Sequence, residues 1–190
     1  MSSETEIANK ALSLINVKSI NALSETSSKE AREINLIFYS VLDEILEEPT
    51  ATWSFSTKTT SLAKLTDTPL YKWTYIYQLP TDMLRIIEIV DSNGYYIDKW
   101  ERQGMTILCD TDSPIYLKYV YRPTNVVNLT PIFVECFAAK LAAKLANKLT
   151  SDKGAQDRSE ILYEKTLKKS VLADANNSLD DYSLTYEEIA

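Results

Sequence analysis

Residues 73–85 read Trp-Thr-Tyr-Ile-Tyr-Gln-Leu-Pro-Thr-Asp-Met-Leu-Arg. In the first half, alternate positions are occupied by Tyr75, Tyr77 and Leu79, as expected for residues on one face of a strand. Pro80 has no backbone N–H to donate to a strand ladder, and the Thr-Asp pair after it carries side chains that bond in turns. The stretch therefore predicts a strand, a corner and a second strand, and it indicates a structural role.

The same β character extends across residues 53–122, where β-branched and aromatic residues are dense. Trp53 and Phe55 alternate with serines, so we expect them to begin a strand and to lie in the core. Turn-forming residues separate the further strand candidates. These cover residues 71–79, 84–90, 95–100, 105–109 and 115–122. The region as a whole predicts about six antiparallel strands.

Helical periodicity replaces this alternation toward both ends of the chain. Capping boxes beginning at Ser3 and Ser27 precede apolar stripes, and Thr130 is a suitable N-cap before Pro131. The predicted helices cover residues 3–16, 28–48, 131–149 and 154–174. We expect the third to pack on the second, and the fourth to use a weaker apolar side that includes Ile161 and Leu172. Together these patterns predict an α+β domain over residues 1–175, in which helices from both termini bundle against the central β region.

The composition argues against several kinds of function. The chain has 190 residues, 20 of them basic and 27 acidic, and a net charge of −7, which is unsuited to neutralising nucleic-acid phosphates. It has no histidine, which removes the usual general base and the commonest metal ligand. Its three glycines lie too far apart for a phosphate-binding loop. We predict that the protein is not an enzyme, with no catalytic residue, no cofactor and no metal.

The residues that invite a chemical interpretation have simpler alternatives. Cys109 and Cys136 form no metal or redox motif, so we expect buried free thiols in preference to a disulfide, which fits a reducing compartment. Asp110 and Asp112 could face a cation, but an acidic turn is favoured because no calcium-loop spacing is present. The N-terminus lacks the basic start and apolar run of a signal peptide, and no segment is apolar enough to span a membrane.

The aromatic residues of the β region have two interpretations. One is a base-stacking platform, which requires a basic groove that this sequence does not supply. The other is a sheet core together with a subunit interface, where tyrosine is enriched. We favour the second and assign Tyr95, Tyr96 and Trp100 to a possible subunit interface.

Lys140, Lys144 and Lys148 recur every four residues opposite the apolar face of their helix. A solvated helix face is the simpler interpretation. The alternative is a subunit interface, in which the row meets acidic residues of a neighbouring copy and sets its register. The candidate acids are Glu30, Glu33, Glu44 and Glu47.

The arrangement of these motifs resembles the tail tubular protein A family, the head-to-tail adaptors of short-tailed bacteriophages. The segments that carry the resemblance are Trp53 to Phe55 with Leu62, Tyr75 to Pro80 with Asp82, Leu84 and Arg85, residues 115–124, and the alanine-rich residues 133–149. The resemblance implies an α+β adaptor that forms a ring, typically dodecameric, between the portal protein and the tail nozzle protein. DNA would pass through the channel without specific binding. The protein would belong to the tail or neck of the virion and to the host cytoplasm during assembly.

Residues 176–190 are expected to form an extended C-terminal docking arm. Apolar side chains recur every two to three residues among acids, a spacing that suits an extended segment laid in a groove. These are Leu179, Tyr182, Leu184, Tyr186 and Ile189. We expect the arm to order only in the assembled particle, inserted into the portal or a neighbouring subunit; the alternative is a frayed terminus. An alternative function for the whole chain is an interaction module of another ring assembly, or a neck or head-completion protein.

Overall fold

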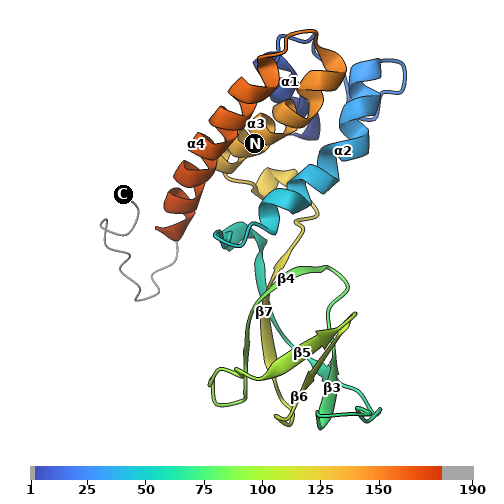
Figure 1. Cartoon of the computed structure of the whole chain (residues 1–190), viewed down its shortest axis with the longest axis vertical. Coiled ribbons are helices and arrows are strands. Elements are labelled where there is room, and N and C mark those ends of the chain that lie inside the picture. Colours follow the sequence, from blue (N-terminus) through green and yellow to red (C-terminus); the bar gives the residue numbers. More distant parts are fainter. Residues whose placement is uncertain (1–2, 177–190) are drawn as a thin grey trace.

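A computed structural model of the chain describes residues 3–176 and confirms the α+β fold class. Helices from both ends of the chain gather at one end of the molecule, and the strands of the middle segment form the other end (Figure 1). Within the described residues the α-helices are α1 (Glu4–Leu14), α2 (Lys29–Leu46), α3 (Pro131–Leu149) and α4 (Ala155–Ala175).

The helix starts follow from their capping residues. At α1 the predicted box is confirmed, because Glu6 N–H donates to Ser3 Oγ at 3.2 Å and Ser3 N–H donates to the Glu6 carboxylate at 2.8 Å. The box predicted from Ser27 is wrong. Ser28 caps α2 and accepts from Ala31 N–H at 3.0 Å, while the Ser27 hydroxyl donates to a glutamate before it.

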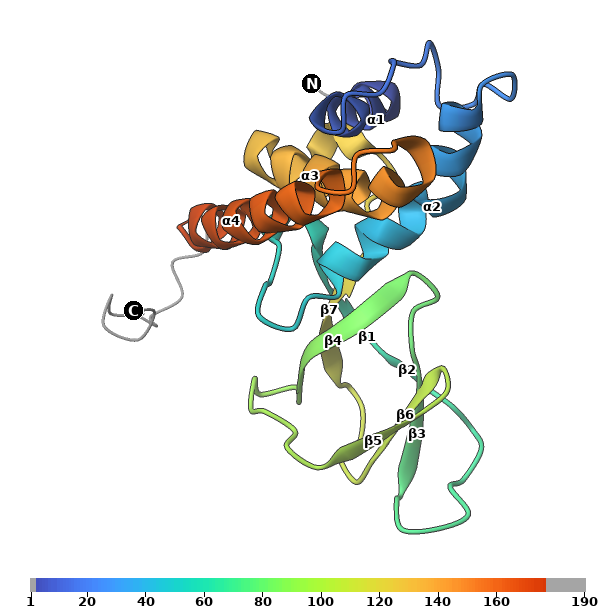
Figure 2. The ribbon, with the colours of Figure 1, turned by 45° about the horizontal axis from the view of Figure 1, so that its top comes forward.

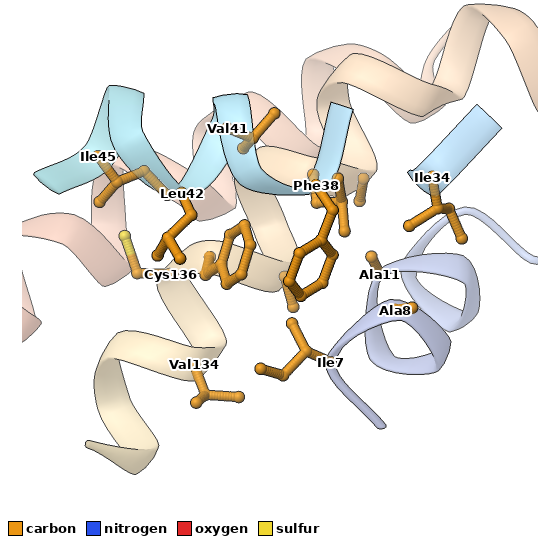
Figure 3. Close-up of a cluster of buried hydrophobic side chains, with 14 of the residues drawn as sticks. Ile7, Ala8, Ala11, Ile34, Phe38, Val41, Leu42, Ile45, Val134 and Cys136 are labelled. Atoms are coloured by element: carbon orange, nitrogen blue, oxygen red, sulfur yellow. The ribbon is translucent and has the colours of Figure 1, made fainter. Parts of the chain in front are cut away.

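Helix α3 lies at the centre of the helical region, with α1, α2 and α4 packed around it (Figures 1 and 2). The predicted contact with α2 is confirmed by the rings of Phe38 and Phe137, which meet edge to face with centroids 4.9 Å apart. The buried side chains of this cluster converge from α1, α2 and α3 in Figure 3. Against α4 the packing uses small residues, Ser159 and Ser170 facing the alanine-rich helix, so the two backbones approach closely.

Trp53 lies in this helical cluster, fully buried, as the sequence predicts. Its indole N–H donates to Ile45 O at 3.2 Å and its ring meets Phe133 edge to face at 4.8 Å. Only the start of the predicted strand is wrong: the short 3₁₀ helix η1 (Ser54–Ser56) occupies it, and the strand begins at Thr57. The serine hydroxyls bond to groups distant in sequence, Asp174 and Tyr121 O, in place of a ladder.

The described strands form two antiparallel sheets, ordered β1-β7-β4 and β2-β3-β6-β5. A second buried cluster lies among their side chains. The strands are β1 (Thr57–Ser61), β2 (Ala63–Lys64), β3 (Tyr75–Gln78), β4 (Met83–Val90), β5 (Trp100–Gln103), β6 (Thr106–Cys109) and β7 (Tyr116–Tyr121), and the 3₁₀ helix η2 (Val126–Asn128) follows them. In Figure 2 the sheet formed by β1, β7 and β4 lies next to the helices, and the other sheet lies farther from them.

Two strand predictions need correction. The strand over residues 71–79 begins only at Tyr75, because Lys72 adopts a left-handed backbone with φ +72° that interrupts an extended chain. The strand over residues 95–100 is wrong: that segment pairs with β4 through one bridge, Val90 to Tyr96, and strand β5 begins where it was expected to end.

The corner predicted from residues 73–85 is confirmed. Tyr77 and Leu79 are buried on one face, and the chain turns at Thr81 before β4 begins. Two bulges in β4 then shift its register against β7, and they fall at Leu84 and Ile87. Both side chains pack against the helical cluster, so the bulges connect the sheet to the helices.

Candidate interaction surfaces

Two loops at the end of the sheet region away from the helices carry exposed apolar side chains (Figures 1 and 2). In the connection between β2 and β3, Leu70 is fully exposed and Tyr71 is 84% exposed. In the connection between β4 and β5, Tyr95 and Tyr96 are 73% and 69% exposed. We call these segments the distal loops. Exposed large apolar side chains of this kind mark candidate sites for a protein partner.

The first distal loop is held at its base while its tip projects. Trp73 Nε1–H donates to the Glu101 carboxylate at 3.0 Å, and this bond lowers the pKa of Glu101. Lys72 Nζ lies 4.4 Å from the centroid of the Trp73 ring. Thr74 donates to Asp110 from both its N–H and its hydroxyl, at 3.0 and 2.8 Å. A groove of about 670 Å³ lies between this loop and the strands β5 and β6. A fixed loop beside a groove costs little ordering when a partner binds.

The second distal loop presents two of the three aromatic residues assigned to an interface. The Asp91 carboxylate accepts from the N–H groups of Asn93 and Tyr95, at 2.8 and 2.9 Å, and these bonds lower its pKa. The turn holds Tyr95 and Tyr96 outward. Trp100 lies apart from them on β5, paired with Cys109, and is only 37% exposed. Two of the three residues thus lie in a loop and the third on a strand, and their part in a subunit interface stays a prediction.

The lysine row of α3 has its acidic partners within the same chain. Lys140 Nζ and Lys144 Nζ both lie 3.1 Å from the Glu44 carboxylate, and Lys148 Nζ lies 3.1 Å from Glu33. Burial alone would raise the pKa of Glu44, but the two lysines outweigh it and the pKa is lowered. Two of the four candidate acids, Glu44 and Glu33, thus pair with the row within one chain, and contact with a neighbouring copy stays a prediction. Because both acids lie on α2, the row ties α2 to α3.

Helix α4 carries a different row on its outer face. Ile161, Lys165, Lys168 and Leu172 are all exposed, the two apolar residues by 67% and 52%. The sequence analysis assigned Ile161 and Leu172 to the packing side of the helix, and this prediction is wrong. The side chains of α4 that pack on the helical cluster are Tyr163, Leu167 and Val171. A mostly apolar groove of about 290 Å³ runs beside this outer row, which we call the α4 stripe. Its lining residues are Thr50, Glu164, Leu167, Lys168, Val171 and Leu172.

The lysines of α4 differ from those of α3 in having no acidic partner. None of the ion pairs within residues 3–176 involves Lys165, Lys168 or Lys169. The spacing of the α4 stripe, i, i+4, i+7 and i+11, was a signal in the sequence that one face would combine apolar and cationic residues. The exposure of the first distal loop was signalled less clearly, by Pro69 ahead of an unalternating Leu-Tyr pair.

The thiols and acids that invited a chemical interpretation have structural partners. Cys109 and Cys136 are buried and free, as predicted, and burial raises the pKa of both, that of Cys136 to about 11. Asp110 accepts from threonine, and Asp112 lies 2.6 Å from Lys64 Nζ. Within residues 3–176 no group of three potential metal ligands is present, and no described helix is long and apolar enough to cross a membrane.

The predicted docking arm lies outside the described residues, except for its first residue. Leu179, Tyr182, Leu184, Tyr186 and Ile189 all belong to the segment beyond residue 176. Comparison of the chain with protein-family models and with curated proteins gave no match.

Proposed function

We propose that the protein is a structural component of a bacteriophage virion, a head-to-tail adaptor that forms a ring between the portal and the tail nozzle. In this role it performs no chemistry. It holds one partner at each end and leaves a channel through which the genome passes. The tail tubular protein A resemblance supplies the ring and the partners.

The observation that carries the proposal is the separation of the exposed apolar surfaces. The distal loops lie at one end of the molecule and α4 lies in the helical region at the other (Figure 1). Tyr71, Tyr95 and Tyr96 at the first end and Ile161 and Leu172 at the second are each more than half exposed. A protein that joins two different partners needs two such surfaces, and an enzyme would concentrate its polar groups at one pocket.

The charge of the chain fits a channel through which DNA slides. With a net charge of −7 the protein has few cations to exchange for the counterions of DNA, so it should not grip a duplex. Many of its described lysines are also engaged, Lys140 and Lys144 among them. We expect any binding to duplex DNA at low salt to be lost at physiological salt.

Mass measurement in the presence and absence of a portal ring tests the proposal. A portal ring from the same genome should gain a discrete number of copies of the 21.6 kDa chain, twelve if the ring follows the resemblance. Removal of residues 176–190 should abolish this attachment and leave the melting of the free protein unchanged, because both buried clusters lie within residues 3–175. A full-length chain that never associates with portal rings would contradict the proposal.

The distal loops are tested separately, against the nozzle protein. The double variant Tyr95→Ala/Tyr96→Ala should still attach to portal rings but should lose the nozzle, since most interface energy comes from a few aromatic side chains. Leu36→Ala is the matched control: this leucine is 75% exposed on α2, in the helical region and outside the distal loops. Equal loss of nozzle binding in the two variants would show that the distal loops are not the docking surface.

A further inference from the structure

The groove beside the first distal loop has an apolar floor and a polar edge. Ile76 and Glu101 both pair with Leu108 across neighbouring strands, so the three side chains share one face of the sheet and line the groove. The Glu101 carboxylate accepts from Trp73 Nε1–H and from the side-chain amide of Gln103, both at 3.0 Å. These bonds fix the polar edge in place before any partner binds.

The second distal loop presents Tyr95 as a rigid projection. The N–H of Tyr95 donates to the Asp91 carboxylate, and its C=O accepts from Asp91 N–H, both at 2.9 Å. Gly94, with φ +84°, supplies the left-handed backbone that the turn before it requires. The backbone at Tyr95 is thus held on both sides, while its side chain is 73% exposed. A tyrosine on a fixed backbone loses little conformational freedom when a partner covers it.

The groove and the projection match in size and in chemistry. The groove volume of about 670 Å³ lies in the range of sites that enclose a ligand, about 300–1,000 Å³, so it has room for Tyr95 and Tyr96 together. A tyrosine side chain has an apolar ring and a polar tip. The floor of Ile76 and Leu108 suits the ring, and the amide of Gln103 at the edge suits the hydroxyl.

The charges beside the two surfaces are complementary. Asp98, in the second distal loop, is exposed and takes part in none of the ion pairs found within residues 3–176. Lys72 lines the groove, and its ammonium group lies 3.9 Å from the Glu101 carboxylate, which is longer than a hydrogen bond. An acid beside the projection and a base beside the groove would attract each other if the two surfaces met.

The placement of the two loops indicates a second copy of the chain as the occupant. They lie on opposite sides of the distal end (Figures 1 and 2), so the projection of one chain faces away from the groove of the same chain. When two copies meet through one projection and one groove, each copy keeps its other surface for a further copy. Such a heterologous contact repeats from copy to copy and closes into a ring if the rotation permits.

We propose that the second distal loop of one copy docks in the groove beside the first distal loop of the next copy, with Tyr95 inside the groove and Asp98 next to Lys72. This contact deepens the proposed function, on which it rests for the closure of the ring. The tail nozzle would then meet a rim built from both distal loops of adjacent copies. As a contact between two copies, it can be measured on the free chain.

Photo-crosslinking of the full-length protein tests where the projection lies. Benzoylphenylalanine placed at residue 95 keeps an aromatic side chain there and reacts with the groups that it touches. In a mixture of isotope-labelled and unlabelled chains, cross-links between chains should map to residues 68–76 and 101–108. Their yield should be several-fold higher than from the same group placed at residue 36, which is also highly exposed but lies on α2.

Complementation between two variants tests whether the contact is heterologous. One chain carries the photoreactive group at residue 95 together with Gln103→Trp, which fills its own groove at an exposed position of β5. The other carries Tyr95→Ala/Tyr96→Ala, which removes the projection and keeps the groove. The first chain alone should give no cross-links between chains, whereas the mixture should join one chain of each kind and nothing larger. Thermal melting of each variant separates loss of the contact from loss of folding.

Charge reversal tests the placement of Asp98. Asp98→Lys should lower the yield of cross-links from residue 95 several-fold, and Lys72→Asp in the same chain should restore it, because the pair regains opposite charges. Asp157→Lys, at an exposed acid of α4, is the matched control and should have no effect. Failure of the second reversal to restore the yield would contradict this placement.

Two results would overturn the proposal as a whole. Cross-links that join the second distal loops of two copies to each other would show a two-fold contact that leaves the groove empty. A yield from residue 95 no higher than from residue 36 would show that the loop does not dock on another copy. Attachment to portal rings is measured separately, so portal rings that gain chains without these cross-links would contradict this contact alone. Cross-links without attachment would contradict the adaptor function and leave the contact standing.

Discussion

Helices α3 and α4 pack side by side, and each carries a row of lysines, yet the two rows have opposite surroundings. Lys140 and Lys144 on α3 reach the Glu44 carboxylate of α2, whereas Lys165 and Lys168 on α4 have no acidic partner among residues 3–176. A regular row of charges is therefore not itself a sign of an interface. A row of charges indicates an interface when the charges are left unpaired and lie next to exposed apolar groups.

The two helices also differ in what they bury. α3 is enclosed by its neighbours and contributes Phe133 and Phe137 to the helical cluster. α4 buries mainly small residues, and the hydroxyls of Ser159 and Ser170 bond to carbonyl groups one turn earlier in the same helix. We therefore expect mutations around α3 to affect folding and mutations on the outer face of α4 to affect docking.

The largest effect should come from Trp53→Ala, which empties the space against the start of α3. Trp53 is fully buried, so the free energy of unfolding should fall by about 3–5 kcal/mol. Ile161→Ala on the outer face of α4 is the comparison, and it should change the free energy by no more than about 0.5 kcal/mol. Urea denaturation measures both. An unchanged midpoint for the tryptophan variant would show that the side chain is exposed in solution.

The next effect concerns the tie between α4 and the start of the first sheet. Asp174→Ala removes the acceptor of the N–H and hydroxyl of Ser54, and because Ser54 is itself exposed to water the loss should cost about 0.5–1.5 kcal/mol. Asp174→Asn keeps one acceptor oxygen and should cost less. Thermal melting compares them. If the asparagine variant is as unstable as the alanine variant, the negative charge matters more than the hydrogen bonds.

Local patterns in the sequence predicted most of the elements of this fold. The capping box at Ser3, the alternation that buries Tyr77, and the proline at the start of α3 all act within a few residues of one another, so they can be recognised without the structure. The replacement of the start of the first strand, residues 54–56, by η1 could not be recognised. It depends on bonds from Ser54 and Ser56 to residues 120 and 65 positions away.

The same limit applied to the candidate surfaces. Helical periodicity identifies which residues of α4 share a face, but not which face packs on α3. The buried residues Ser159 and Ser170 are small and allow α4 to approach α3 closely, so their face packs on α3. Ile161 and Leu172, on another face, are left exposed. The exposure of Tyr95 agrees with its assignment to a surface, although the strand expected to begin there was wrong; the turn before it, at residues 91–94, was predictable from local sequence.

A smaller effect should come from breaking the lysine ties of α3. Glu44→Gln removes the acid shared by Lys140 and Lys144, and since these groups are partly exposed it should cost about 1 kcal/mol or less. The loss should shrink further in about 1 M salt, where charges are screened over about 3 Å. Glu160→Gln is the control on α4, because Glu160 has no lysine partner there. A cost for Glu44→Gln that is unaffected by salt would mean that packing, and not charge, holds α2 to α3.

The smallest effect at neutral pH concerns the Cys136 thiol, which lies on α3 and packs toward α4. Burial raises the pKa of Cys136 from 9.0 to about 11, so the thiol stays neutral in the folded protein. Above pH 9 the thiol of the unfolded chain ionises first, and this favours unfolding. The contribution to stability is therefore complete below pH 9 and is lost as the pH rises toward 11.

Urea denaturation of the wild type and Cys136→Ala across this range isolates the effect. The buried tyrosines Tyr77 and Tyr163 also have raised pKa values, but they are present in both proteins, so they contribute in the same direction to each curve. The free energy of unfolding should fall more steeply with pH for the wild type than for the variant between pH 9 and 11. Parallel curves would mean that water reaches the thiol, and that α4 is less firmly packed on α3 than its small buried residues indicate.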